Sequence, residues 1–224
     1  MRHSDTGNWG GYTYQWNAAQ TAATLVKGGL IAHIAAPNQD WIYPSEAQCL
    51  QCHTNAAGGS LGLETAQLNS DLTYPTTGRS ANQLATLNAI GMFETPLTQA
   101  PSALPAYPNP QGSTGTMAEK ARAYLHTNCA QCHRPSGGTP SKMDLRFSTP
   151  IELTNACNVA PNSGNLGIPA AQLIAPGNAE DSLIYVRMSR RDLHQMPPLA
   201  SNLVDTEGAA LIQSWISAMN ASCQ

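Results

Sequence analysis

Apolar and polar residues alternate over short distances in the first part of the chain. Residues 11–16 alternate aromatic and polar side chains, which is the pattern of a strand. Apolar runs at 25–26 and 30–34 flank a Gly28-Gly29 pair, and this arrangement predicts a hairpin that turns at the two glycines. We therefore expect the chain to begin with a small β-rich segment.

Helical spacing dominates the periodic sequence that follows. Ser80 with Gln83, and Thr116 with Glu119, match the capping-box pattern at the start of a helix. Apolar side chains at intervals of three and four residues follow both boxes, and they recur over 205–220. The sequence therefore predicts a mainly α protein.

Prolines and glycines are concentrated between residues 95 and 115, which predicts an irregular and comparatively stiff connection. A chain of 224 residues is long enough for two domains of about 100 residues each. We expect a first domain over 1–105 that includes the β-hairpin appendage, a linker over 106–115 and a second domain over 116–224.

The pentapeptide Cys-x-x-Cys-His occurs once in each expected domain. The first copy supplies Cys49, Cys52 and His53, and the second supplies Cys129, Cys132 and His133. This spacing is the attachment signature of c-type haem. Two thiols three positions apart can each form a thioether with one haem vinyl group, and the following histidine can bind the iron. The sequence therefore predicts two covalently bound haems.

A Cys-x-x-Cys pair also occurs in zinc sites and in dithiol redox motifs. Zinc ribbons usually bring their second pair within about 15–20 residues, whereas residues 54–128 separate the two motifs here. A dithiol motif requires no following histidine, and the βαβ pattern in which it usually lies is missing. The haem interpretation is therefore preferred over both alternatives.

The composition fits a protein that contains a large cofactor. Charged residues make up only 11% of the chain and there are only two phenylalanines. A small domain has difficulty burying enough apolar surface on its own, and a buried macrocycle in each domain would supply it. The haems would then be structural as well as functional.

Charge and hydropathy limit the classes of binding partner and the cellular compartments that the sequence allows. The net charge is −3 without a basic cluster, which argues against nucleic acid. No apolar run reaches the roughly 18 residues of a membrane span. Haem is attached outside the bacterial cytoplasm, yet no apolar signal region follows Met1. We expect a periplasmic or extracellular protein whose export signal, or an upstream domain, has been removed.

Two cysteines remain outside the motifs. Because a leftover even pair in an oxidising compartment suggests a disulfide, we expect Cys157 to be joined to Cys223. Two free buried thiols are the alternative.

A methionine in a rigid loop is the candidate distal ligand of the second haem. In Gln195-Met196-Pro197-Pro198 the two prolines fix the backbone and cannot donate an N–H group. They would hold Met196 in a loop that faces a pocket. Met143 and Met188 are the alternatives.

The distal ligand of the first haem is less constrained by the sequence. Met92 follows directly after the helix that starts near Ser80, and it is the candidate. His33, His3 and an open site are the alternatives. Arg146 could pair with a haem propionate or could simply be solvated.

The second half resembles class I cytochrome c domains. The resemblance covers about residues 116–220 and is carried by Pro176-Gly177, Ser182-Leu183-Ile184, Met196-Pro197-Pro198 and Trp215-Ile216. It implies an all-α fold with His133 and Met196 as axial ligands, and hence two cytochrome c-like domains in the whole chain. The whole chain is similar to a group of exported bacterial dihaem proteins, in which the module is sometimes attached to a quinoprotein sugar-dehydrogenase-like domain. That similarity is carried by Tyr14-Gln15-Trp16-Asn17, Tyr43-Pro44-Ser45, Asn82-Gln83-Leu84 and Tyr124–Cys129.

Electron transfer is the expected function. The protein would accept electrons from a dehydrogenase and pass them to a cytochrome or an oxidase, and it would need no catalytic base. A dihaem peroxidase is the alternative, and it would require the first haem to have an open position for peroxide. A third possibility is an electron-relay domain of a larger oxidoreductase.

Overall fold

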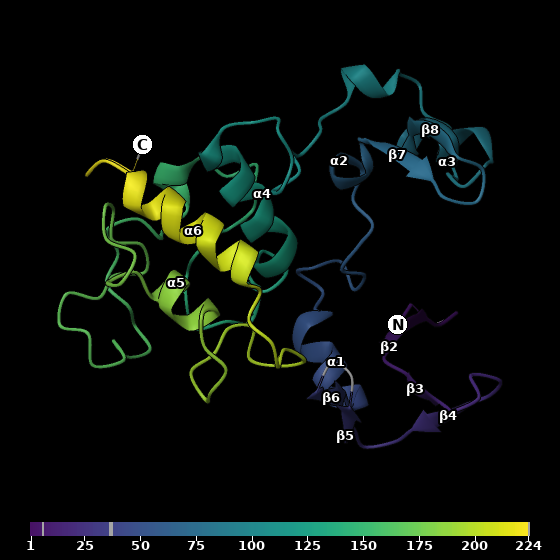
Figure 1. Ribbon diagram of the computed structural model, residues 1–224, viewed down its shortest axis with the longest axis horizontal. Helices are drawn as coiled ribbons and strands as arrows, with labels where there is room; N and C mark the ends of the chain where they lie inside the picture. The colour runs from purple at the N-terminus through teal and green to yellow at the C-terminus, as the bar shows by residue number, and fades with distance from the viewer. Residues whose placement is uncertain (6, 36–37, 224) are drawn as a thin grey trace.

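The computed structural model describes residues 1–5, 7–35 and 38–223 (Figure 1). Helix accounts for 26% of the chain and strand for 16%. The prediction of a mainly α protein is therefore wrong. The 18 glycines and 16 prolines disfavour helix interiors, and long stretches of the chain have neither helical nor strand structure.

The strands of the described residues form four separate two-stranded antiparallel sheets. These are β1 (Arg2–His3) with β2 (Trp9–Gly10), β3 (Thr13–Trp16) with β4 (Ala23–Val26), β5 (Leu30–Ala35) with β6 (Asn38–Tyr43), and β7 (Asp71–Tyr74) with β8 (Arg79–Asn82). The expected hairpin about Gly28-Gly29 is wrong, because β4 pairs backward with β3 and β5 pairs forward with β6. The two glycines instead connect two hairpins.

The helices of the first half are α1 (Glu46–Cys52), α2 (Thr65–Leu68) and α3 (Gln83–Ala89). Helix α1 begins with a capping box, in which the Ser45 hydroxyl accepts from the Gln48 N–H and the Gln48 side chain accepts from the Ser45 N–H. Helix α3 begins at Asn82 rather than at Ser80, because Ser80 lies in β8 and Asn82 Oδ1 accepts from the Leu84 N–H at 2.9 Å. Both helix starts thus follow from short polar side chains.

The segment expected to be a linker is held by specific contacts. The Asn69 side-chain amide donates hydrogen bonds to the carbonyls of Pro101, Leu104 and Pro105, next to the 3₁₀ helix η1 (Pro101–Ala103). A little further on, the Tyr107 ring packs against those of His126 and Phe147 in the second half. The connection is therefore fastened to both halves of the chain.

The second half is built on α4 (Met117–Cys129), α5 (Leu183–Met188) and α6 (Thr206–Ala218), with a short 3₁₀ helix η2 (Ile151–Leu153). The capping box of Thr116 and Glu119 is present at the start of α4, as predicted. The buried core of this half contains residues from all three α helices, including Leu125, Ile212, Trp215 and Ile216. Figure 1 shows α5 and α6 side by side, with α4 against α6.

Helices α4 and α6 approach closely at one small residue. A Cβ atom on Gly208 would lie less than 3.0 Å from the ring and hydroxyl of Tyr124, closer than Cβ atoms are ever found. The Tyr124 hydroxyl donates to Asp205 Oδ2 at 2.9 Å, and Asp205 Oδ1 accepts from the Gly208 N–H at 2.9 Å. The N-terminus of α6 is therefore locked onto α4, which ends at the second motif.

Two further features of the fold concern the expectations above. The structure joins Cys157 and Cys223 in a disulfide, with Cα atoms 6.3 Å apart. Among the helices of the described residues, none combines the length and apolar character that crossing a bilayer requires.

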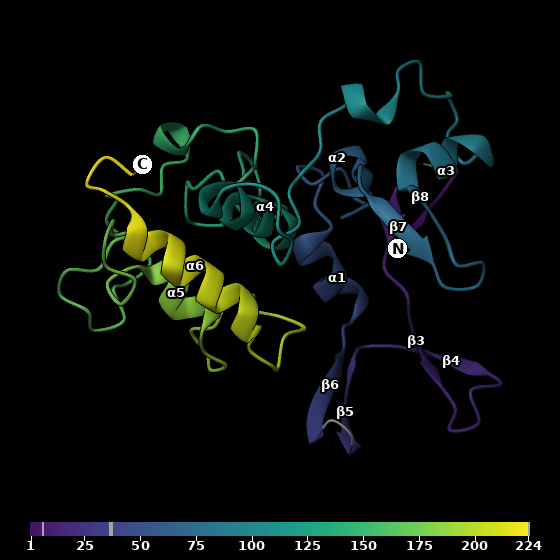
Figure 2. The same ribbon diagram turned by 45° about the horizontal axis from the view of Figure 1, so that its top comes forward.

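Figure 2 shows α1, which carries the first motif, between the β5–β6 hairpin and α4.

Candidate functional site

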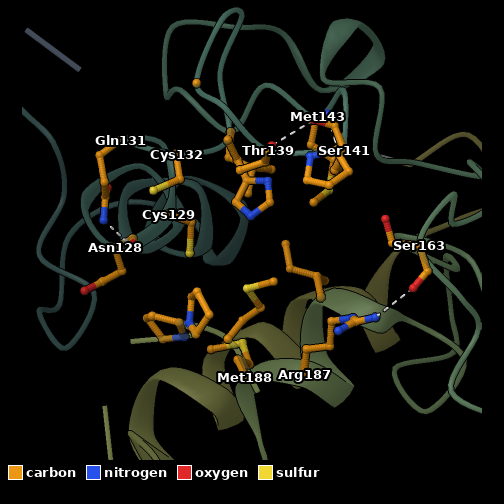
Figure 3. Close-up of a pocket in the computed structure, with 18 of the residues that line it drawn as sticks. Asn128, Cys129, Gln131, Cys132, Thr139, Ser141, Met143, Ser163, Arg187 and Met188 are labelled. Atoms are coloured by element: carbon orange, nitrogen blue, oxygen red, sulfur yellow. Dashed lines mark hydrogen bonds between the residues drawn. The ribbon is translucent and has the colours of Figure 1, made fainter. Parts of the chain in front are cut away.

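A cavity of about 770 Å³ lies in the second half, and its lining is mainly apolar. Cys129, Cys132, His133 and Met196 all line it. Figure 3 shows Cys129 and Cys132 on one side of the cavity and Arg187 and Met188 on the opposite side, with the Cys129 sulfur directed into the space between. The structure thus brings together every residue that the sequence predicted for the second haem, apart from Arg146.

The second motif is positioned by the end of α4 and the turn that follows. The Cys132 and His133 N–H groups both donate to the Cys129 carbonyl, at 3.1 and 2.9 Å, so the three side chains share one turn. The His133 carbonyl in turn accepts from the Leu145 N–H at 2.9 Å. Burial raises the pKa of the Cys129 thiol to about 12, so this thiol stays protonated inside the cavity wall.

His133 has the properties of an imidazole that can bind a metal. Burial lowers its pKa, so the ring is neutral near pH 7. Its Nδ1 atom is buried and has no hydrogen-bond partner among the described residues. A neutral imidazole is the form in which histidine binds metals.

The loop that carries Met196 is tied to α5. The Met196 N–H donates to the Arg187 carbonyl at 2.9 Å. The Gln195 side-chain amide donates to the carbonyls of Pro197 and Ser201, at 3.0 and 2.8 Å. Because these bonds hold the backbone on both sides of Met196, its side chain stays at the cavity wall.

Met143 and Met188, the alternatives to Met196, also line the cavity. Met143 is 7% exposed and belongs to the hydrophobic core, and Met188 packs against that core. Both therefore have a packing role in addition to lining the cavity. The structure brings all three thioethers to one space.

Arg146 does not line the cavity. Its guanidinium pairs with both carboxylate oxygens of Asp144, at 2.8 and 2.5 Å, on the part of the chain that follows the motif. Its expected contact with a haem propionate is therefore replaced by an internal ion pair. The cations that do line the cavity are Arg187 and Arg191, which the sequence analysis missed. Local spacing gave no signal for this pair, because Arg187 lies in α5 whereas Arg191 lies beyond its end.

The first motif lies on α1, and its histidine is already oriented. His53 follows the last residue of α1, and its Nδ1 atom forms a 2.7 Å hydrogen bond with the Gly59 carbonyl. Since a carbonyl can only accept, Nδ1 carries the proton and Nε2 keeps a free lone pair. Metal-binding histidines usually show this arrangement, because the second hydrogen bond fixes the tautomer and the ring. Gly59 packs directly under the Trp9 indole, where no larger residue would fit.

The structure does not bring the predicted distal ligand to the first motif. Met92 is 66% exposed beyond the end of α3, and both views of the ribbon place α3 well away from α1 (Figures 1 and 2). His33 is exposed and pairs with Asp40 at 3.1 Å. His3 packs its ring against that of Trp9, with centroids 5.0 Å apart.

The two motifs lie against one another. The thiols of Cys52 and Cys132 influence one another, so that the pKa of Cys52 is lowered to about 6 and that of Cys132 is raised. The Cys132 sulfur also lies 4.0 Å from the Gln51 carbonyl oxygen. Leu50, Gln51 and Cys52 of the first motif, with Thr54 just after it, form part of the lining of the cavity.

Among the described residues, no cluster of three or more histidine, cysteine, aspartate or glutamate side chains could hold a metal ion. A histidine and a methionine that line the same cavity are a different kind of ligand set. Comparison with protein-family models, curated proteins and solved structures gave no match. The interpretation of the site therefore depends on its own chemistry.

Proposed function

We propose that this protein is a dihaem c-type cytochrome that passes single electrons between redox proteins outside the cytoplasm. The observation that carries the proposal is that Cys129, Cys132, His133 and Met196 line one mainly apolar cavity of about 770 Å³. Such a volume is in the range of cofactor sites. When bound, haem supplies an iron that alternates between Fe(II) and Fe(III).

Each cavity residue has a definite task in this proposal. Cys129 and Cys132 anchor the macrocycle through thioethers, and the neutral imidazole of His133 provides the proximal ligand. Met196 provides a thioether on the other side, held in place by the backbone bond to Arg187. The apolar lining keeps water away from the iron, and methionine ligation raises the potential.

Arg187 and Arg191 replace Arg146 as the candidates for pairing with the propionates. Both line the cavity. The Arg187 guanidinium already donates to the His194 carbonyl at 3.2 Å, and that of Arg191 donates to the Leu203 carbonyl at 2.7 Å. A guanidinium has five N–H donors. Arg187 makes two hydrogen bonds and can still bind a carboxylate, whereas Arg191 makes four and has less donor capacity left.

In the first half, Cys49, Cys52 and His53 would hold the other haem. Support comes from the 2.7 Å bond of His53 Nδ1 to the Gly59 carbonyl, which leaves Nε2 for the iron. A dehydrogenase donor and a cytochrome or oxidase acceptor are the partners we propose, and neither requires the chain to supply an acid or a base.

A dihaem peroxidase is the second candidate, and one observation favours it. Met92 is exposed and α3 lies away from α1, so Met92 has no support from the fold as a ligand of the first iron. Peroxide needs an open position at one iron. The spin state of the oxidised protein distinguishes the two functions, because an open first site gives a high-spin signal that changes on addition of peroxide.

The mass of the protein and a haem stain test the proposal directly. Two covalent haems should be found, and a mass equal to that of the bare chain would refute it. The oxidised protein should also show the near-infrared band of an iron–methionine bond. We expect Met196→Ala to lose this band while Met188→Ala and Met143→Ala keep it. A band that survives in Met196→Ala and disappears in either control would move the ligand assignment to that methionine.

A further inference from the structure

We propose that the two haems form a single pair that meets at the thioethers of Cys52 and Cys132. This inference rests on the proposed function, since it requires both haems to be attached. It goes beyond that function because it specifies where the two cofactors meet and how an electron passes between them.

The inference begins with the cysteines themselves. Cys52 and Cys132 are each the second cysteine of their motif, and both line the same cavity. The Cys132 sulfur lies 4.0 Å from the carbonyl oxygen of Gln51, the residue before Cys52. If haem were attached, each sulfur would be bonded directly to a former vinyl carbon of its own macrocycle. The two thioethers would then lie at one place, where the two motifs meet.

Other contacts show that this meeting of the motifs is built into the fold. Beyond the 4.0 Å approach of the Cys132 sulfur to the Gln51 carbonyl, the Arg134 guanidinium donates to the Ala56 carbonyl at 3.0 Å. Both bonds join a residue of one motif region to the backbone of the other. The turn after the second motif is thereby fixed against the turn after the first.

A buried histidine fastens the same interface from α4. His126 is 7% exposed, and its Nε2 atom lies 2.7 Å from a carboxylate oxygen of Glu64 in the first half. Its Nδ1 atom accepts from the Phe147 N–H at 3.0 Å, so Nε2 carries the proton and donates to Glu64. Because both ring nitrogens are used, His126 holds the two halves together and is not a candidate iron ligand.

The surface that separates the two sites is thin. Leu50, Gln51 and Cys52 of the first motif, and Thr54 just after it, line the cavity of the second motif. Residues of the first motif would therefore be in direct contact with the second macrocycle. If both haems were bound, they would supply the chemistry for electron transfer within the protein, in which one iron would lose the electron that the other gains and no bond would break.

Circular dichroism in the Soret region tests the pair, because closely spaced haems couple their transitions. The variants Cys49→Ser/Cys52→Ser and Cys129→Ser/Cys132→Ser should each retain one haem. We expect the wild-type spectrum to differ from the sum of the two single-haem spectra by a couplet, which is lost in both variants. A wild-type spectrum equal to that sum would overturn the inference.

Electron paramagnetic resonance of the oxidised wild type provides a second measurement that needs no variant. Two nearby ferric haems broaden each other's signals, and the broadening should vanish when only one of them is reduced. Two haems by mass together with unbroadened signals would refute the pair and leave the proposed function intact. A chain without covalent haem would refute the proposed function itself.

Discussion

Replacement of Gly208 by alanine tests how the second motif is positioned. The added Cβ would lie less than 3.0 Å from the ring and hydroxyl of Tyr124, so the ring or helix α6 must shift. Overpacking of this kind costs about 1–3 kcal/mol. A shifted ring also loses its bond to the Asp205 carboxylate, which is worth about 1.5–3 kcal/mol.

Alanine offsets part of this cost, because it favours a helix over glycine by about 1 kcal/mol. The sum predicts that Gly208→Ala lowers the free energy of unfolding by about 2–5 kcal/mol. Urea titration of the holoprotein, followed by far-ultraviolet circular dichroism, measures this. Ser217→Ala is the matched control, because Ser217 is exposed on the same helix and its replacement should change stability by less than about 0.5 kcal/mol.

The cause can be separated from the size of the effect. If the collision with Tyr124 is responsible, the double variant Gly208→Ala/Tyr124→Ala should lose less stability than the sum of the two single variants. Wild-type stability of Gly208→Ala, or simple additivity in the double variant, would refute the reasoning.

Other parts of the fold lead to further predictions. His126→Ala should destabilise the protein by about 1–3 kcal/mol, more than Glu64→Gln does, because it also leaves the half-buried Phe147 N–H without its acceptor; urea titration of both variants would detect the reverse order. The pKa of Asp144 is held near 2 by its arginine partner, so its stabilising effect is complete above about pH 4 and is lost as the pH falls towards 2. As the pH is lowered across this interval, the free energy of unfolding should therefore fall less steeply in Asp144→Asn than in the wild type. Equal slopes would contradict the ion pair. The denatured, unreduced holoprotein should contain no titratable thiol, and two reactive thiols would show that the disulfide is wrong. Replacement of Cys157 and Cys223 by serine should lower the free energy of unfolding by about 4 kcal/mol, because the unfolded chain regains the entropy of the closed loop.

The sequence predicted local features well where one side chain decides the outcome. The capping box of Thr116 and Glu119 is present, and the prolines after Met196 do mark a loop at the cavity. Each of these depends on residues only a few positions apart. The haem motifs are also defined by local spacing, and the attachment of haem to them stays a prediction.

Features that depend on contacts distant in sequence were predicted poorly. The strand at 23–26 had two possible partners with similar alternation, and tertiary context chose β3. Met92 was selected because few other methionines occur in the first half, which says nothing about where α3 packs. Arg146 lies close to the second motif in sequence. Its guanidinium nevertheless pairs with the carboxylate of Asp144, which is only two residues away.

The disulfide also separates the residues that line the cavity into two groups, one inside the covalent loop that it closes and one outside that loop. Arg187, Met196 and every other lining residue from Pro161 onward lie in the covalent loop closed by Cys157 and Cys223, whereas the second motif lies outside it. Reduction of this one bond would increase the conformational freedom of the segment that carries Met196. The segment that carries His133 lies outside the loop, so its chain connectivity would not change. The oxidation state of the surroundings can thus act on the segment that carries Met196 without acting on the segment that carries His133.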